Sequence, residues 1–131
     1  MEQSRFILDS NVLLALYIEN DQLKAAAEVL FEEIEGSEMI IPYCVIEEVC
    51  TILTYRVSKK TAVAFLEDIQ NADGVLILND MITEEINFFK NLDAKISFTD
   101  SSLLYLSKLW KAELMTFDHQ LLKLYKKSKK V

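Results

Sequence analysis

Residues that interrupt regular structure are scarce in this chain, which has only two glycines and one proline among 131 residues. We therefore expect mostly helices and strands joined by short connections. No apolar run approaches the roughly 20 residues of a membrane helix, and the N-terminus lacks a signal-peptide pattern, so no membrane association is expected. Because 51% of the residues are hydrophobic, we expect one domain with a sizeable core over residues 1–131.

Metal-binding residues of the softer kind are also rare, with two cysteines and one histidine. Cys44 and Cys50 fall in one predicted helix, about 240° apart around its axis, which disfavours a disulfide or a shared metal ion. Both are expected to be small core residues. This cysteine usage predicts a reduced, cytoplasmic protein.

Basic residues are few outside the C-terminal end. The net charge is −7, and residues 1–122 carry 21 acidic but only nine basic side chains, whereas the lysine-rich tail, residues 123–131, carries five lysines and no acid. Such an acidic body repels polyanions, so binding of nucleic acid would require a metal ion or the tail to offset the repulsion. The tail is equally explained as a solvated helix end, where lysines are favourable.

Short apolar runs alternate with segments of helical periodicity. Strands are predicted at 5–8, 39–41, 75–78 and 113–117. Helices are predicted at 11–18, 21–35, 43–55, 58–72, from the cap residue Thr83 to about 93, from Ser97 or Thr99 through 110, and from Asp118 onward. This alternation predicts a three-layer α/β/α fold, in which a parallel sheet of four or five strands is flanked by helices.

Acidic residues stand where these elements meet. Asp9 follows the first strand, Asp118 follows the fourth, and Asp100 opens the helix before the fourth; Glu47 and Glu48 lie about one turn into the helix after the second strand. Ligands of such sheets bind beyond the carboxyl ends of the strands, so these acids should share one edge. Each Asp alone could be a helix cap. Together they would repel one another unless a hard cation such as Mg²⁺ or Mn²⁺ were bound.

Four stretches carry a family resemblance. FILDSN, PYCVIEEVCTIL, SFTDSSLLYLSKL and ELMTFDHQL resemble, in order, the four acidic motifs of PIN domains along nearly the whole chain. At this length the chain is similar to the VapC-type ribonuclease toxins. The resemblance places the four acids on Asp9, Glu48, Asp100 and Asp118. Glu48 fits the motif better than Glu47 because a valine and then an apolar pair follow it.

The resemblance implies a metal-dependent ribonuclease that hydrolyses RNA phosphodiester bonds, with Mg²⁺ or Mn²⁺ held by the four acids. It also implies an antitoxin protein as partner; residual apolar helix faces could serve this partner or a homodimer. Asn11 and Thr116 would orient the carboxylates as hydrogen-bond donors. Helix capping and strand propensity account for these two residues equally well.

For other polar residues, the sequence gives a weaker indication of a functional role. Arg56, Lys59 and Lys60 could hold RNA phosphates, although a solvated loop explains them equally. His119 is expected at the surface rather than as a general acid. The apolar stretch 12–18 would serve either as core or as a surface for a partner.

Some features depart from the family pattern or suit another class. Ser101 stands where alanine is common, no glycine precedes the fourth strand, and the short end after Asp118 predicts that a usual last strand is reduced or missing. A catalytically inactive PIN-like module that binds RNA or protein is one alternative. A response-receiver domain is another; Asp80 after the third strand would suit it, but Ser10 after Asp9 and the lack of a late Lys-Pro do not.

Overall fold

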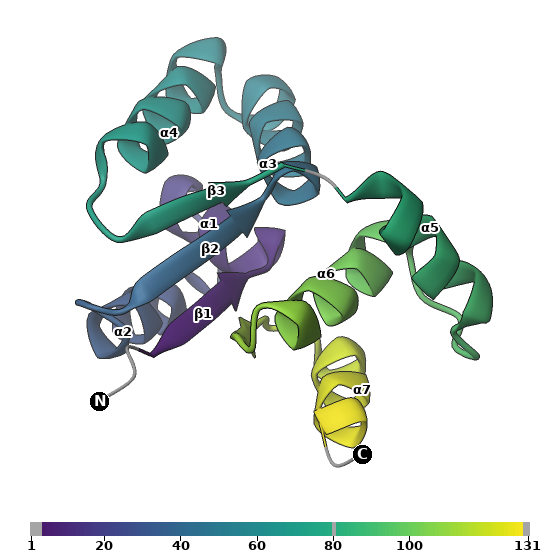
Figure 1. The fold of residues 1–131 in the computed structure, drawn as a ribbon. Coiled ribbons are helices and arrows are strands. Elements are labelled where there is room, and N and C mark those ends of the chain that lie inside the picture. Colours follow the sequence, from purple (N-terminus) through teal and green to yellow (C-terminus); the bar gives the residue numbers. More distant parts are fainter. Residues whose placement is uncertain (1–3, 80, 130–131) are drawn as a thin grey trace.

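A parallel sheet forms the centre of the molecule (Figure 1). The computed structural model describes residues 4–79 and 81–129, so Asp80 lies outside the described residues. Within them the sheet has four strands in the order β3-β2-β1-β4, all parallel. The strands are β1 (Arg5–Leu8), β2 (Glu38–Pro42), β3 (Val75–Leu78) and β4 (Glu113–Met115).

Helices cover both faces of this sheet, as predicted (Figure 1). They are α1 (Ser10–Tyr17), α2 (Lys24–Glu33), α3 (Tyr43–Arg56), α4 (Lys59–Asn71), α5 (Ile82–Asn91), α6 (Phe98–Leu109) and α7 (His119–Lys129). Helices α1 to α4 pack against one another, whereas α6 packs on β1 and β4, with α5 and α7 against it. The predicted three-layer α/β/α class is therefore confirmed.

The strand order creates a switch point between β1 and β4. The chain moves from β1 outward to β2 and β3, and then returns through α5 and α6 to add β4 on the other side of β1. Leu8 of β1 pairs with Met115 of β4, and the next amide, Asp9 N–H, donates to the Met115 carbonyl at 2.9 Å. Crevices at such switch points are the usual ligand sites of open parallel sheets.

The core fills the space between the sheet and the helices. From the stretch 12–18, the residues Val12, Leu13, Leu14, Ala15 and Ile18 are buried, which supports the core interpretation of that stretch. Cys44 and Cys50 are half-buried and pack against the core, as expected for small apolar side chains. None of the helices within the described residues is long and apolar enough to cross a membrane.

Several element ends differ from the predictions for physical reasons. The strand predicted at 113–117 ends at Met115, because the Phe117 amide donates to Asn11 Oδ1 at 3.1 Å rather than to a neighbouring strand. Thr83 is not the cap of α5: the helix starts at Ile82 with Met81 as its N-cap, two residues earlier than predicted, and Glu85 Oε2 accepts the Met81 amide at 2.7 Å. After β4 the described residues form α7 and no fifth strand, consistent with the short C-terminal segment.

Candidate active site

The four predicted acids come together at the carboxyl edge of the sheet. They line one cavity of about 400 Å³, which also includes Ser10, Asn11 and Ser97 in its wall. The acids come from four places in the chain: the ends of β1 and β4, the second turn of α3 and the first turn of α6. Only the folded sheet brings them together, since they are spread over more than one hundred residues.

Asp9 is the most deeply buried of the four, with 5% of its surface exposed. It is the N-cap of α1, and its Oδ1 accepts the Ser10 amide at 2.7 Å. Its Oδ2 accepts the Thr116 hydroxyl at 2.7 Å. Burial raises the pKa of the Asp9 carboxyl, the hydrogen bonds from Thr116 and Ser10 act in the opposite direction, and the nearby charge of Asp118 adds to the rise.

Thr116 and Asn11 form a small hydrogen-bonded network behind Asp9. Thr116 donates directly to the Asp9 carboxylate, and its oxygen accepts from Asn11 Nδ2 at 3.2 Å and from the Asp118 amide at 3.0 Å. The Asn11 side chain forms its hydrogen bonds with Thr116 and with the amide of Phe117 rather than with an acid. The network therefore joins the ends of β1 and β4, a role that capping or strand propensity alone does not provide.

Helix capping accounts for part of the acidic set. Asp118 Oδ1 accepts the amides of Gln120 and Leu121 at 2.9 and 3.1 Å, and so it caps α7. Asp100 caps no helix, because Ser97 is the N-cap of α6 and its hydroxyl accepts the Asp100 amide at 3.0 Å. Of the three aspartates, Asp100 is therefore the one whose position helix capping does not explain.

The charges of the four acids act on one another. The pKa of Asp100 is raised from 3.8 to about 6, first by burial and then by the negative charges of Asp9, Asp118 and Glu48; the Ser97 hydrogen bond opposes this rise. Such mutual repulsion is unfavourable in the protein alone, and a bound cation would relieve it.

Glu48 and Glu47 have different surroundings. Glu48 is half-buried and lines the acidic cavity, whereas Glu47 is exposed and is absent from its wall. Both border a shallower neighbouring depression that includes Cys44. The helical phase of α3 therefore distinguishes two adjacent residues of identical chemistry.

The donor set suits a hard divalent cation. The cavity wall offers carboxylate oxygens, while His119 is exposed and does not line it. Across residues 4–79 and 81–129, no three acidic, His or Cys side chains are close enough together to hold one ion between them. Mg²⁺ usually takes only one or two carboxylates directly and keeps several waters, so an open arrangement of four acids fits such an ion.

The predicted phosphate contacts lie elsewhere. Arg56, Lys59 and Lys60 are exposed at the junction of α3 and α4 and do not line the cavity. Arg56 lies eight residues beyond Glu48 on α3, or about 12 Å along the axis. In contrast, Ser97 and Thr99 line the cavity without having been predicted there; the only sequence signal was their predicted role as caps.

Together these features describe an α/β protein whose parallel sheet carries a carboxylate-lined cavity at its switch point. The family model of the PIN domain matches residues 6–127, and the chain therefore belongs to the PIN domain family. The family resemblance of the sequence is thus confirmed, and this membership supports a nuclease activity.

A comparison with solved structures gives a related result. The fold is similar to that of VapC20 from Mycobacterium tuberculosis, a Sarcin-Ricin loop cleaving toxin, with a TM-score of 0.77 and 17% sequence identity. The similarity covers 88% of this chain and 92% of the VapC20 chain. A comparison with curated proteins gave no match.

Proposed function

We propose that this protein is a Mg²⁺- or Mn²⁺-dependent endoribonuclease that hydrolyses RNA phosphodiester bonds in the cytoplasm. The observation that carries the proposal is the cavity into which four separate elements bring Asp9, Glu48, Asp100 and Asp118. The PIN family and the fold shared with a toxin that cleaves the Sarcin-Ricin loop support RNA as the substrate.

The four acids would surround the cation, one or two of them as direct ligands and the others, such as Glu48, through bound water. A bound divalent cation lowers the pKa of a coordinated water and stabilises negative charge on the phosphate. Thr116 and the Ser10 amide fix both oxygens of Asp9, and Asn11 fixes Thr116. The protein therefore supplies oriented carboxylates, and its proposed role is to position the ion and the phosphate.

The experiment is an assay of purified protein on a mixed pool of cellular RNA, with Mn²⁺, with Mg²⁺ or with EDTA. Cleavage is expected with either ion and should stop in EDTA. Glu48→Gln should reduce the rate strongly, whereas Glu47→Gln, its exposed neighbour, should leave the rate unchanged. Folding of both variants is checked by thermal melting.

Two outcomes would overturn this proposal. Cleavage that is identical in EDTA would remove the role of the cation. A folded protein that binds RNA but never cuts it, with or without ions, would make the inactive binding module the correct alternative.

We further propose that the protein is the toxin of a toxin–antitoxin pair, with an antitoxin protein as partner and a homodimer as its own assembly. The likeness to VapC20, itself a toxin, supports this role. Expression of the chain alone should arrest growth, and co-expression with the protein encoded in the neighbouring reading frame should restore it. Arrest by the wild type and by Asp100→Asn alike would contradict a toxin that acts through cleavage.

A further inference from the structure

A second cavity lies at the opposite edge of the sheet, at the amino ends of β1 and β4. Its volume is about 670 Å³, which is larger than that of the acidic cavity. Four of its lining residues are basic, namely Arg5, Lys108, Lys111 and Lys129, and one, Glu113, is acidic. In a chain of net charge −7, this cavity is a concave concentration of positive charge.

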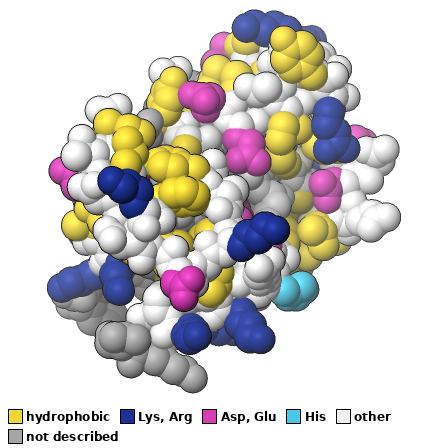
Figure 2. Space-filling model, turned by 90° about the vertical axis from the view of Figure 1, so that its right-hand side faces the viewer, with side chains coloured by type: hydrophobic (Ala, Val, Ile, Leu, Met, Phe, Trp, Pro, Cys, Tyr) yellow, Lys and Arg dark blue, Asp and Glu magenta, His cyan; other side chains and the backbone are white. Residues whose placement is uncertain are grey.

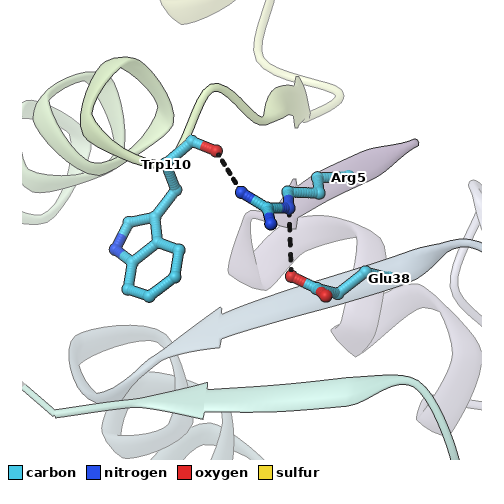
Figure 3. A network of polar contacts seen from close by, with 3 residues as sticks. All are labelled: Arg5, Glu38 and Trp110. Atoms are coloured by element: carbon cyan, nitrogen blue, oxygen red, sulfur yellow. Dashed lines mark hydrogen bonds and ion pairs between the residues drawn. The ribbon is translucent and has the colours of Figure 1, made fainter. Parts of the chain in front are cut away.

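Arg5 is fixed in place at the rim of this cavity. Figure 3 shows its guanidinium between the Glu38 carboxylate and the Trp110 carbonyl, at 3.4 Å from Glu38 Oε1 and 3.3 Å from the Trp110 oxygen. Guanidinium has five N–H donors, so these two contacts leave others for a ligand. None of the three lysines forms an ion pair with an acid among the described residues, so their charges are not neutralised in this way.

Lys111 is held in an unfavourable backbone conformation. Its φ is +52°, and it is the one residue other than glycine with positive φ in the part of the chain that the structure describes. A glycine would adopt this conformation at lower cost, because it has no Cβ. Lys111 directly follows Trp110, the C-cap of α6, and the amides of Lys111 and Ala112 donate to the carbonyls of Lys108 and Ser107, so the left-handed conformation serves to end this helix. Here it places a lysine side chain in the wall of the cavity.

Helix α7 connects the two edges of the sheet. Asp118, directly before α7, lines the acidic cavity, while Tyr125 and Lys129 near its end line the basic one, with Lys129 Nζ 5.9 Å from the centre of the Tyr125 ring. The exposed lysines 123, 126 and 127 lie between them in the sequence of α7. Figure 2 shows several Lys and Arg side chains in the lower part of the face it draws and others at its top and sides, while most acidic side chains of this face lie in its upper part.

We propose that the basic cavity binds backbone phosphates of an RNA strand that extends along α7 from the acidic cavity. This inference rests on the proposed function. Arg5 begins β1 and lines the basic cavity, while Asp9 directly follows β1 and lines the acidic cavity, so the backbone positions of these two residues are about 13 Å apart along the strand direction. The acidic cavity repels RNA in the absence of metal, whereas the basic cavity attracts the phosphates regardless of the metal. The basic cavity thus supplies affinity, and the acidic cavity supplies cleavage.

The test measures binding in EDTA, so that its result does not depend on cleavage. Fluorescence anisotropy of a labelled single-stranded oligoribonucleotide is recorded over a range of salt concentrations for the wild type and two variants. The Lys108→Ala/Lys111→Gly variant should bind roughly tenfold more weakly, and the slope of log K against log salt should fall by about 1.4, the value for two lost phosphate contacts. Lys90→Ala/Lys95→Ala is the matched control, because it removes the same charge from exposed positions outside the cavity.

Removal of the strain at Lys111 gives a second readout. Lys111→Gly alone should raise the melting temperature while it weakens RNA binding, a combination that loss of structure cannot produce. Equal losses of RNA affinity in the cavity variant and the control would overturn the proposal, since net charge alone would then explain them. An unchanged RNA affinity of the cavity variant would also overturn it. Displacement of the RNA by AMP at similar concentrations would also overturn it, because the cavity would then be a mononucleotide site.

Discussion

At the scale of single residues, the Asp9 carboxylate accepts hydrogen bonds at both oxygens, from the Ser10 amide and from the Thr116 hydroxyl. Thr116→Val removes the second bond but keeps the shape of the side chain. We expect a loss of about 2 kcal/mol in the free energy of unfolding, because a buried carboxylate loses a partner. We also expect metal affinity to fall by roughly 10- to 100-fold, the usual effect of losing such a supporting contact.

Urea unfolding and calorimetric titration with Mn²⁺ measure these two effects. Thr116→Ser is the control, because it keeps the hydroxyl and should retain most of the metal affinity. If the Val and Ser variants bound Mn²⁺ equally well, the Thr116 hydroxyl would not orient Asp9.

Asp100 leads to a pH-dependent prediction for the metal-free protein. Its pKa is raised from 3.8 to about 6 by burial and by its acidic neighbours, so the folded state holds the proton more tightly than the unfolded state. The stability contributed by this proton is present below about pH 3.8 and is lost as the pH rises through about 6. In EDTA, wild type should therefore lose roughly 1 kcal/mol relative to Asp100→Asn between pH 4 and 7, a figure reduced for solvent screening of a half-buried group. If the free energy of unfolding changed equally with pH in the two proteins, the raised pKa of Asp100 would be contradicted.

The position of the acids could be predicted from the sequence, but their connections could not. Asp9 and Asp118 follow apolar strands, and the carboxyl ends of parallel strands meet at one edge. The bond between Thr116 and Asn11 spans 105 residues of sequence, and it depends on which strands become neighbours. The positive φ of Lys111 could not be predicted either, since no glycine occurs at that turn in the sequence.

At the scale of elements, serine caps position two helices in the same way. Ser97 Oγ accepts the Asp100 amide at 3.0 Å at the start of α6, and Ser58 Oγ accepts the Thr61 amide at 3.0 Å at the start of α4. Such caps are visible in the sequence as serine before a helical pattern. Thr83 also stands before a helical pattern, but the prediction that it caps α5 was wrong. Met81 is the N-cap of α5, and its amide donates to the side chain of Glu85 from inside the helix.

These two caps allow a matched comparison. Ser97→Ala and Ser58→Ala should each lower the free energy of unfolding by about 1 kcal/mol, the usual cost of a lost cap. Only Ser97→Ala should weaken Mn²⁺ binding, because it releases the turn that carries Asp100 and removes a hydrogen bond that holds down the Asp100 pKa. Chemical denaturation and Mn²⁺ titration of both variants test this. Equal Mn²⁺ affinity in the two variants would show that the cap serves the helix alone.

At the scale of the whole molecule, the alternation of strands and helices predicted the fold class but not the strand order. Buried parallel strands all have similar apolar sequences, so nothing in RFIL or VLIL indicates which strand pairs with which. The order β3-β2-β1-β4 places the crevice between β1 and β4, and this placement brings Asp9 and Asp118 together. It also places the basic cavity at the far edge, so the sheet has an acidic cavity at one edge and a basic cavity at the other.

Global stability should therefore depend on the divalent cation. An ion that binds only the folded carboxylates stabilises the fold by about 2.7 kcal/mol at 100 times its dissociation constant. For a chain of 131 residues this corresponds to a rise of roughly 10 °C in melting temperature. Without ions, Asp9→Asn should melt at or above the wild-type temperature, since one repelling charge is gone. With saturating Mn²⁺ it should melt below the wild type.

Differential scanning calorimetry in EDTA, Mg²⁺ and Mn²⁺, with NaCl added to equal ionic strength, measures this reversal. Glu47→Gln removes a charge of the same sign from the exposed side of α3, and it should keep the full shift with Mn²⁺. A wild-type melting temperature that Mn²⁺ does not change would contradict an ion site among the four acids. A shift retained in Asp9→Asn but lost in Glu47→Gln would place the ion in the neighbouring depression beside Cys44 instead.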